Sequence, residues 1–368
     1  MKKKNLCKTL LKTMCIVLGI LILALLAYIV YLYASYYRIE DNQELVVEAP
    51  VDDTTTGAAA VLATDTEYSA VTYNIGFGAY LPDYSFFMDG GTSSWAESPE
   101  TVQYAINGAG ELVKSLDPDF ALIQEIDLDA TRSYHTDEYE MLRNLLPEYT
   151  TVFAQNYDSA FLFYPFTQPH GSSRAGLGLF SKYPVSSALR RSFPISTSFS
   201  KFFDLDRCYS VSRIPVDNGK ELVIFNLHMS AYGNSDEIRK GQIEMLCNDM
   251  AKEYEAGNYV LCGGDFNHDL KASEEDTESC ESWAFPFPRT ELPEHFAFCL
   301  DLLSSEEQAA LWNSARNADM EYVPGVTYTV TLDGFIISDN IECLSYENVN
   351  TGYSYSDHDP VKVEFALK

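Results

Sequence analysis

The polar residues that follow the apolar stretch 260–264 have the types and the spacing of a catalytic site. Two glycines end this stretch, and Asp265 and Asn267 come directly after them. The pattern predicts a buried strand that ends in a polar loop, where glycine lets a ligand approach the backbone closely. Residues two apart on an extended chain point the same way, so the carboxylate and the amide converge on a hard cation or a water. The plainer alternative is a turn, because turns favour Asp and Asn.

Polar groups also end four other predicted strands, at Asn74, at Glu125, at His228 and at Asp357 with His358. In an α/β sandwich such strand ends can meet at one rim. The set holds acids and two histidines but no cysteine, so Mg²⁺ or Mn²⁺ is favoured over zinc. Such a site suits hydrolysis of a phosphate ester, in which a carboxylate activates water. Singly, His228 could instead be a buried core histidine and Asp357 a turn former.

Strand and helix signals alternate along the chain and predict the elements that position these groups. Predicted strands cover 68–75, 120–123, 150–155, 176–180, 208–215, 221–227, 327–337, 341–347 and 361–365, besides the one that enters Asp265. Predicted helices cover 99–116, 137–146, 236–254 and 305–317. Ser98 and Pro99 form an N-cap and N1 pair, and Asp217-Asn218-Gly219 predicts a hairpin. The alternation favours one large α/β domain.

Residues 14–33 contain no charged side chain and would span roughly 30 Å as a helix, which matches a bilayer core. The lysines of residues 1–40 all precede this stretch, so we expect the N-terminus in the cytoplasm and the rest of the chain outside it. A cleavable signal peptide is the alternative, but the apolar run is long for one and Leu32-Tyr33-Ala34 is a poor cleavage site. The expected divisions are a lysine-rich tip and transmembrane anchor over 1–37, an acidic flexible stalk over 38–66 and a catalytic domain over 67–368.

The charge is strongly uneven along the chain. The formal net charge is -29, and residues 1–40 hold six of the 25 Lys and Arg residues but one of the 54 Asp and Glu residues. The remaining residues therefore carry a net charge near −34. Such a body repels nucleic acid and anionic membrane unless metal ions or a basic cleft intervene.

The cysteines do not suggest a zinc site, because no CxxC pair is present. Cys7 and Cys15 belong to the predicted anchor. Isolated buried thiols are the expected state of most of the others, although their disulfide state stays open: Cys208, Cys247, Cys262, Cys280, Cys299 and Cys343.

Six sequence blocks resemble the endonuclease/exonuclease/phosphatase superfamily of DNase I-like metal-dependent phosphoesterases, and the predicted anchor adds the resemblance to a membrane-anchored bacterial-type member. The blocks are Thr72-Tyr73-Asn74-Ile75, Gln124-Glu125, Asn226-Leu227-His228, Gly264-Asp265-Phe266-Asn267, Leu332-Asp333-Gly334-Phe335 and Ser356-Asp357-His358-Asp359-Pro360. The resemblance implies a four-layer α/β sandwich of two mixed β-sheets flanked by helices, with the site at one end.

The resemblance also implies roles for the polar side chains of these blocks. Glu125 would be the principal metal ligand, with Asn74 and Asp357 completing a site for Mg²⁺ or Mn²⁺. Asp265 would orient or deprotonate the attacking water and Asn267 would hold it. The remaining implied roles are phosphate contacts by His228 and His358, and a pairing of Asp333 with one imidazole.

Two other features could contact a substrate. Arg174 and Arg207 are scarce cations in an acidic body and are candidate phosphate contacts, or else members of ordinary surface ion pairs. The aromatic run 161–166 could contact lipid or stack on bases, although such runs more often belong to a core.

The substrate stays open between a lipid, a nucleic acid and a small phosphoester. The anchor favours a phospholipid or isoprenoid phosphate. The sequence has no basic, aromatic-interleaved stripe for a nucleic acid to follow, which argues against a nuclease. A binding or scaffolding protein that kept the fold and lost the chemistry is the alternative of another class, but every expected acid and histidine is present. No particular protein partner can be inferred.

Overall fold

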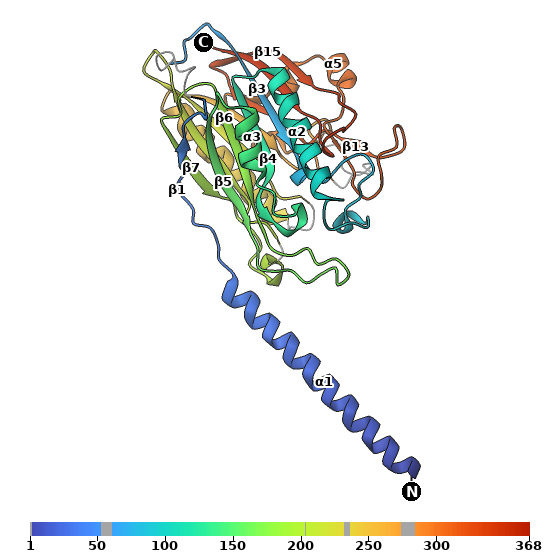
Figure 1. The fold of residues 1–368 in the computed structure, drawn as a ribbon. Helices are drawn as coiled ribbons and strands as arrows, with labels where there is room; N and C mark the ends of the chain where they lie inside the picture. Colours follow the sequence, from blue (N-terminus) through green and yellow to red (C-terminus); the bar gives the residue numbers. More distant parts are fainter. Residues whose placement is uncertain (1, 53–60, 203, 232–235, 274–283) are drawn as a thin grey trace. The chain divides into compact units, whose positions relative to one another are not determined.

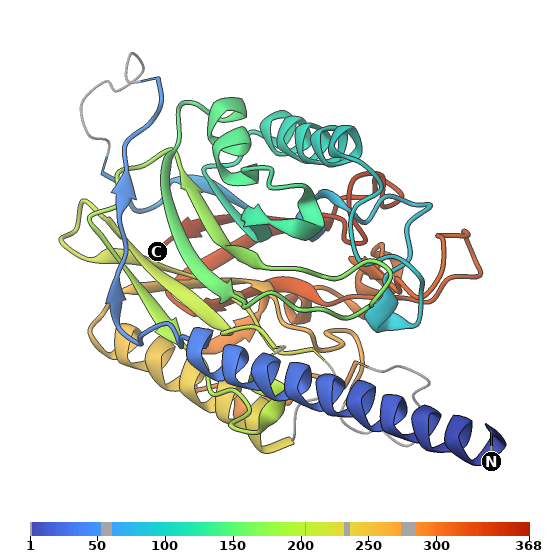
Figure 2. The same ribbon diagram turned by 60° about the horizontal axis from the view of Figure 1, so that its bottom comes forward.

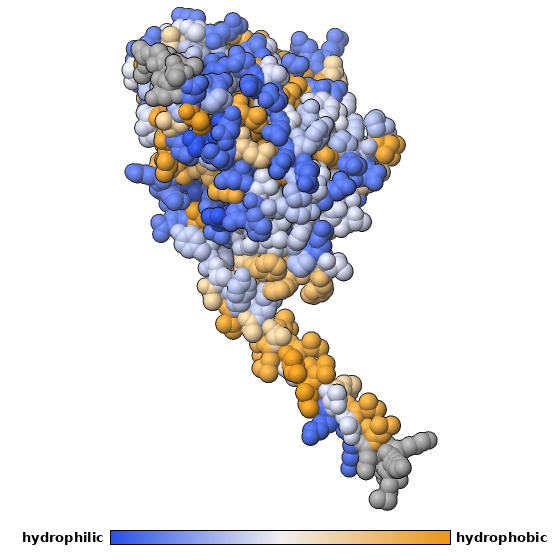
Figure 3. All heavy atoms as spheres, viewed as in Figure 1, coloured by the Kyte–Doolittle hydropathy of each residue, from blue (hydrophilic) through white to orange (hydrophobic). Residues whose placement is uncertain are grey.

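The computed structural model describes residues 2–52, 61–202, 204–231, 236–273 and 284–368. The chain forms two units, one up to Arg38 and one from Ile39 to Lys368. The first unit is helix α1 (Lys2–Ser35), whose stretch Leu6–Ser35 is long and apolar enough to cross a membrane. Its surface is coloured mostly as hydrophobic in Figure 3.

The second unit is built on two seven-stranded mixed sheets (Figure 1). One sheet has the order β15 (Ile341–Asn348), β16 (Val361–Leu367), β3 (Glu67–Asn74), β4 (Phe120–Ala130), β6 (Ser173–Ser181), β5 (Thr150–Asp158) and β2 (Val47–Glu48). The other has the order β1 (Gln43–Glu44), β7 (Ser187–Ser192), β8 (Cys208–Pro215), β9 (Glu221–His228), β10 (Tyr259–Asp265), β14 (Asp333–Ser338) and β11 (Phe296–Phe298). The pairs β3–β4 and β9–β10 are parallel, and a separate ribbon joins β12 (Ala315–Arg316) to β13 (Thr329–Val330).

Helices cover the outer faces of both sheets, which gives four layers (Figure 2). Helices α2 (Pro99–Leu116) and α3 (Glu138–Leu145) pack on the sheet that contains β4, and α4 (Asp236–Glu255) packs on the sheet that contains β10. The shorter elements are α5 (Ser305–Ala310) and the 3-10 turns η2 (Gly76–Gly78), η3 (Phe87–Asp89), η4 (Thr131–Ser133), η5 (Phe199–Phe202), η7 (Arg289–Glu291) and η8 (Cys299–Leu302). The expected four-layer α/β sandwich is confirmed.

The sequence explains why α2 forms where it does. The Ser98 hydroxyl accepts a hydrogen bond from the Thr101 backbone N–H, and Pro99 occupies the first helical position. The buried side chains recur at helical spacing on one face: Val102, Ala105, Ile106, Ala109 and Val113. This face contacts the outer surface of the sheet, so that α2 supports the strand ends that carry Asn74 and Glu125.

The segment 39–52 pairs with both sheets. Strand β1 adds to β7 at one sheet edge, and β2 adds to β5 at the edge of the other sheet. This differs from the expected flexible stalk over 38–66, whose residues 53–60 lie outside the described part of the chain. Strands of two residues are too short to show an alternating pattern in the sequence. Their position is determined by pairing with the edge of a sheet.

Two predicted elements near the C-terminus also differ from the structure. The helix expected over 305–317 ends at Ala310, and the strand expected over 327–337 is divided into β13 and β14. The Ser314 hydroxyl explains both differences, because it accepts hydrogen bonds from the backbone N–H groups of Leu332 and Asp333 at 3.0 and 3.1 Å. The chain after Ala310 must extend inward to make these contacts.

The aromatic run 161–166 is largely exposed, which differs from the core interpretation. Phe163, Tyr164 and Phe166 expose 50%, 64% and 84% of their surface, whereas Leu162 is buried. Among the described cysteines no disulfide is present; Cys208, Cys247, Cys262 and Cys299 are buried thiols, and Cys343 is partly buried. Cys280 lies outside the described residues.

We expect Gly264→Ala to destabilise the domain severely. Gly264 has φ +146°, and an added Cβ would lie 2.1 Å from the Leu227 carbonyl oxygen on the neighbouring strand. Because backbone cannot move aside, the loss should exceed about 3 kcal/mol. Gly219→Ala is the matched control: its φ is +80° but its Cβ meets nothing within 4 Å, so the loss should stay near 1 kcal/mol. Thermal unfolding of the full chain in detergent compares the two, and equal losses would contradict the clash.

Candidate active site

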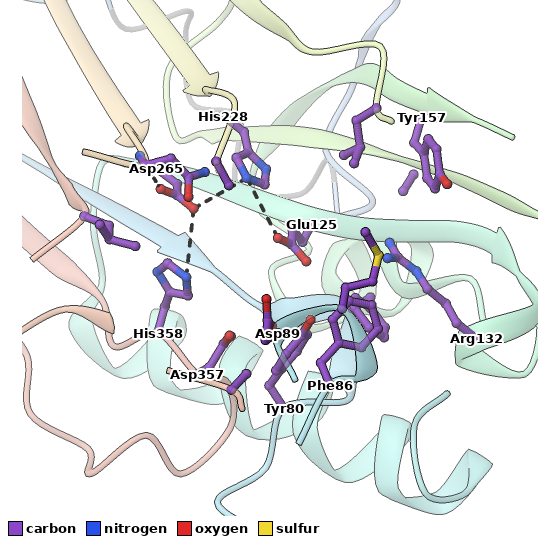
Figure 4. Close-up of a pocket in the computed structure, with 18 of the residues that line it drawn as sticks. Tyr80, Phe86, Asp89, Glu125, Arg132, Tyr157, His228, Asp265, Asp357 and His358 are labelled. Carbon is purple, nitrogen blue, oxygen red and sulfur yellow. Dashed lines mark hydrogen bonds and ion pairs between the residues drawn. The ribbon is translucent and has the colours of Figure 1, made fainter. Parts of the chain in front are cut away.

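The strand ends of both sheets bring the predicted polar groups to one pocket (Figure 4). Asp265 on β10 is in register with His228 on β9 and with Asp333 on β14. In the other sheet Asn74 on β3 is in register with Gln124 on β4, directly before Glu125. The remaining two groups, Asp357 and His358, lie in the loop that enters β16.

Asp265 lies at the centre of the site. Its Oδ1 accepts a hydrogen bond from the Asn267 backbone N–H at 2.8 Å, and its Oδ2 accepts one from Asn74 Nδ2 at 3.0 Å. The same Oδ2 is 3.5 Å from His228 Nε2 and 3.9 Å from His358 Nε2. Burial and the charge of Asp333 raise the pKa of Asp265 to about 7. This carboxylate can therefore accept a proton near neutral pH.

Asn74 links two carboxylates of the site through its amide nitrogen. Its Nδ2 donates to Asp265 and, at 3.2 Å, to Glu125 Oε1, while its Oδ1 accepts a hydrogen bond from the Gly76 backbone N–H at 3.0 Å. Because Gly76 can only donate there, the orientation of the amide is unambiguous. The amide oxygen keeps a second lone pair, so the metal role expected for Asn74 stays a prediction.

The two imidazoles have opposite electrostatic environments. Burial disfavours the charged form of His358, but its 2.7 Å hydrogen bond to Asp333 and the charges of Asp265 and Asp357 raise its pKa well above the ordinary 6.5. Burial, together with the positive charges of Arg207 and His358, lowers the pKa of His228 well below 6.5. At neutral pH His358 is thus a cation and His228 a neutral imidazole.

Asp333 is held so that it fixes the orientation of His358. It is fully buried, and its Oδ2 accepts hydrogen bonds from His358 and from the Ser314 hydroxyl at 2.7 Å each. The contact matches the imidazole partner that the family resemblance implied for Asp333. Ser314 was not expected in the site, and no signal in its sequence neighbourhood could have revealed it.

Glu125 and Asp357 face the pocket as oxygen donors. Glu125 has φ +56° and lies where the register of β4 against β6 shifts, so a bulge turns its side chain out of the sheet. Burial and the charge of Glu125 raise the pKa of Asp357, against the opposing charges of His358 and Arg316. Two carboxylates that repel each other in one pocket, without a thiol nearby, suit a hard divalent cation.

A second group could hold a metal ion by distance alone. Ligand atoms of Asp265, Asp333 and His358 lie within 4.8 Å of one another. The His358–Asp333 hydrogen bond already occupies two of these atoms, however, and Asp333 is fully buried. The pair Glu125 and Asp357, which lines the open pocket, fits an ion better.

The pocket has a volume of about 480 Å³ and continues beyond the acids toward an aromatic end. In Figure 4 Arg132 and Tyr157 lie on the opposite side of Glu125 from Asp265 and His358. Arg207 lines this pocket, whereas Arg174 does not: its guanidinium is half exposed and pairs with Asp129 at 3.1 Å. All the predicted site residues except Arg174 thus line the pocket or contact a residue that does: Asn74 is hydrogen-bonded to Asp265, and Asp333 to His358.

Several lining residues were not expected from the sequence. Arg132 is bound to Asp127 through two hydrogen bonds of 2.8 and 3.0 Å and lies flat on Phe77, 3.7 Å from the ring centroid. The scarcity of cations that singled out Arg207 could have revealed Arg132 as well. Asn156 and His170 carry no comparable signal, since their places depend on the pairing of β5 and on the loop that follows it.

The fold and the site define a class of hydrolases that cleave phosphoester bonds on an α/β sandwich. The model of the "Endonuclease/Exonuclease/phosphatase family" matches residues 71–302, and the chain belongs to this family. It is therefore a phosphoric ester hydrolase, while its substrate type is not resolved by membership. No curated protein matched the sequence.

Solved structures with the same fold share little sequence with this chain. An endonuclease/exonuclease/phosphatase from Beutenbergia cavernae DSM 12333 has 16% identity and a TM-score of 0.54, covering 82% of this chain and 72% of its own. One from Bacteroides vulgatus has 17% identity and a TM-score of 0.54, covering 83% and 100%. D. rerio TDP2 complexed with single strand DNA product has 13% identity and a TM-score of 0.54, covering 82% and 100%. At these identities the likeness shows the fold.

We expect Asp265→Asn to change how stability depends on pH. Asp265 keeps its proton up to a pH of about 7 in the folded chain but releases it near pH 3.8 in the unfolded chain. Its ionisation therefore lowers the stability of the fold: the loss is absent below pH 3.8, grows between the two pH values and is complete above about pH 7. The melting temperature of Asp265→Asn relative to the parent should therefore rise from pH 4.5 to pH 8. Thermal unfolding of the full chain in detergent with EDTA measures this difference. A difference independent of pH would show that the carboxylate ionises without penalty.

Proposed function

We propose that this chain is a divalent-metal-dependent phosphoesterase that hydrolyses a phosphate ester or diester by attack of an activated water. The observation that carries the proposal is the position of the Asp265 carboxylate between a cationic and a neutral imidazole, in a pocket that Glu125 and Asp357 also line. A basic group, a fixed positive charge and a cation-binding pair are the parts that phosphoryl transfer to water requires.

Asp265 is the group that takes the proton of the water. Its pKa of about 7 lets it exist as a base while still binding a proton during the reaction. Asn267 orients the water beside it: the Asn267 Nδ2 donates to the Met229 carbonyl oxygen at 2.9 Å, which fixes the amide at the mouth of the pocket.

The imidazoles bind the phosphoryl group. His358 donates from Nε2, because its Nδ1 is committed to Asp333, and its positive charge offsets the charge that develops on the phosphoryl oxygens. His228 Nε2 lies 3.8 Å from Glu125 Oε1 and 3.5 Å from Asp265 Oδ2, between the cation-binding acid and the base. It contacts the phosphoryl group from the side opposite to His358.

Glu125 and Asp357 would hold Mg²⁺ or Mn²⁺, since both offer carboxylate oxygens to the pocket. When bound, such an ion supplies positive charge to the phosphoryl oxygens and lowers the pKa of a coordinated water. Asn74 keeps Glu125 in place through its 3.2 Å hydrogen bond.

The location that the chain itself supports is a membrane. Helix α1 is long and apolar enough to cross a bilayer once, and the lysines in its N-terminal part favour a cytoplasmic N-terminus. The catalytic domain then lies outside the cytoplasm. The substrate is a small or lipid-borne phosphoester, because the net negative charge of the domain opposes a polyanion. A nuclease is the alternative, since D. rerio TDP2 of the same fold is complexed with single strand DNA product.

We expect Glu125→Gln to abolish most of the activity and to leave the fold intact. The substitution keeps the shape and the acceptor for Asn74 but removes the charge that holds the cation, so the rate should fall roughly 100-fold or more. Hydrolysis of bis-p-nitrophenyl phosphate and of p-nitrophenyl phosphate by the full chain in detergent measures it.

Glu111→Gln on the exposed face of α2 is the matched control and should keep the parent rate. A parent-like rate for Glu125→Gln would exclude the proposed mechanism. Plasmid DNA and RNA are included as substrates, and cleavage of these alone would make the chain a nuclease.

We expect EDTA to remove the activity and Mg²⁺ or Mn²⁺ to restore it, because the pocket offers carboxylate oxygens without thiols. Zinc should restore less. The rate is measured after chelation, dialysis and addition of each ion. Full activity in EDTA would contradict the metal assignment, and inactivity on every phosphoester with every ion would favour the binding or scaffolding role.

A further inference from the structure

The end of the pocket away from the acids contains buried hydrogen-bond donors without partners. Arg207 exposes 7% of its surface, yet neither its Nε nor its Nη1 has a hydrogen-bond partner among the described residues. A buried guanidinium without an acceptor costs free energy, so such groups are normally paired. Asp204 also lines this end, but its Oδ1 accepts from the Leu205 backbone N–H at 2.8 Å. Two guanidinium nitrogens of Arg207 thus lack an acceptor among the described residues.

Asn156 provides a second donor of this kind. It exposes 1% of its surface, lines the pocket, and its Nδ2 has no partner among the described residues. It lies where the register of β5 against β6 shifts between Gln155 and Tyr157, so a bulge turns it out of the regular alternation of the strand. A bulge that turns a buried amide into a pocket is a feature of binding sites.

The two donors are held together where β5 of one sheet meets β8 of the other. Fully buried Arg190 donates from Nε to the Gln155 carbonyl at 2.6 Å and from Nη2 to the Asp206 carbonyl at 2.8 Å. These carbonyls precede Asn156 and Arg207 in the chain, so one guanidinium fixes the backbone of both donors. The site is therefore built before any ligand arrives.

Arg132 adds a third donor at the same end. Its Nε and Nη2 are bound to Asp127, which leaves Nη1 without a hydrogen bond among the described residues. The guanidinium lies between Phe77 and Tyr157, 3.7 and 6.0 Å from the ring centroids. Such apolar neighbours lower the local dielectric constant and so strengthen charge interactions with a ligand.

This group is separated from the catalytic carboxylates. Ile126, next to Glu125, pairs with Gly176, and Gly176 pairs with Gln155, so Asn156 is two strands away from Glu125, or roughly 10 Å. Arg207 precedes β8, whose Tyr209 pairs with Leu227, so it lies one strand, or about 5 Å, from the end of β9. One phosphoryl group at Asp265 does not reach Asn156.

We propose that Arg207, Asn156 and Arg132 form a second anion subsite, which selects a small phosphoester that carries a second phosphate besides the one hydrolysed. The proposal rests on the proposed function for the reacting phosphate, whereas the subsite itself is read from the three donors. A second phosphate provides acceptors for the unpaired nitrogens of Arg207 and Asn156, and for the Nη1 that Arg132 does not use to bind Asp127.

The test compares ligands that differ in the second phosphate alone. Calorimetry with the full chain in detergent and Mg²⁺ measures binding of thymidine 5'-phosphate and thymidine 3',5'-bisphosphate. We expect the bisphosphate to bind at least about tenfold more tightly, since charge-assisted hydrogen bonds contribute about 1.5 kcal/mol or more. Arg207→Gln and Asn156→Asp should each reduce this preference to within about twofold, because they weaken binding of the bisphosphate much more than binding of the monophosphate.

Turnover is measured with the 5'-p-nitrophenyl diesters of the same two nucleotides, one without and one with the 3'-phosphate. Both should be hydrolysed, the bisphosphate with the lower KM. Preferential binding without turnover of either ester would refute the proposed reaction and keep the subsite.

Controls separate the subsite from folding and from general charge. Lys114→Gln on α2 should change neither affinity, and Arg207→Gln should melt no lower than the parent because Nε and Nη1 of Arg207 have no hydrogen bond to lose among the described residues. Equal binding of both ligands by the parent would overturn the proposal. So would an equal loss of both affinities in Arg207→Gln, because Arg207 would then contact the reacting phosphate.

Discussion

A buried hydrogen bond between two amides joins the sheets directly beneath the site, and the geometry of the pocket depends on it. Gln124 Nε2 donates to Asn226 Oδ1 at 2.8 Å, and Asn226 Nδ2 donates to the Gly178 carbonyl at 3.0 Å. Both side chains are fully buried, so either would be costly without the other. Gln124 immediately precedes Glu125, and Asn226 lies two residues before His228. The pair therefore fixes the position of Glu125 in one sheet relative to His228 in the other. Apolar contacts between the sheets are not directional and would not fix it.

The electrostatics of the site follow from this close approach of two strand ends. Burial and the charge of Asp333 raise the pKa of Asp265, burial and the charge of Glu125 raise that of Asp357, and the charge of His358 offsets part of both effects. Asn74 and Asp333 supply the hydrogen bonds that keep the groups in place. Burying these acids costs free energy of folding at the place where a cation and a phosphate would bind. Such a cost is common at enzyme sites, where activity is often gained at the expense of stability.

The segment after the apolar helix is part of the same architecture. Ile39 donates its backbone N–H to Asp206 Oδ2 at 3.0 Å, and the Glu40 carbonyl accepts from Arg190 Nη1 at 3.2 Å. Arg190 also fixes the backbone before Asn156 and Arg207. The junction that leads to α1 and the aromatic end of the pocket therefore share one buried guanidinium, and the domain begins at Ile39 and not after a loose tether.

Strand ends, helix caps and the order of polar groups are local properties, and the sequence by itself determined them: Ser98 starts α2, and β10 ends at Asp265, directly after two glycines. The sequence also determined the family, because its blocks keep their order and spacing. Only the tertiary structure decided which way Asn74 turns its amide, that Ser314 reaches Asp333, and that Arg132 and Asn156 line the pocket while Arg174 does not. These positions depend on β-bulges and on contacts between residues far apart in the chain. Such contacts leave no periodic pattern in the local sequence, so it cannot predict them.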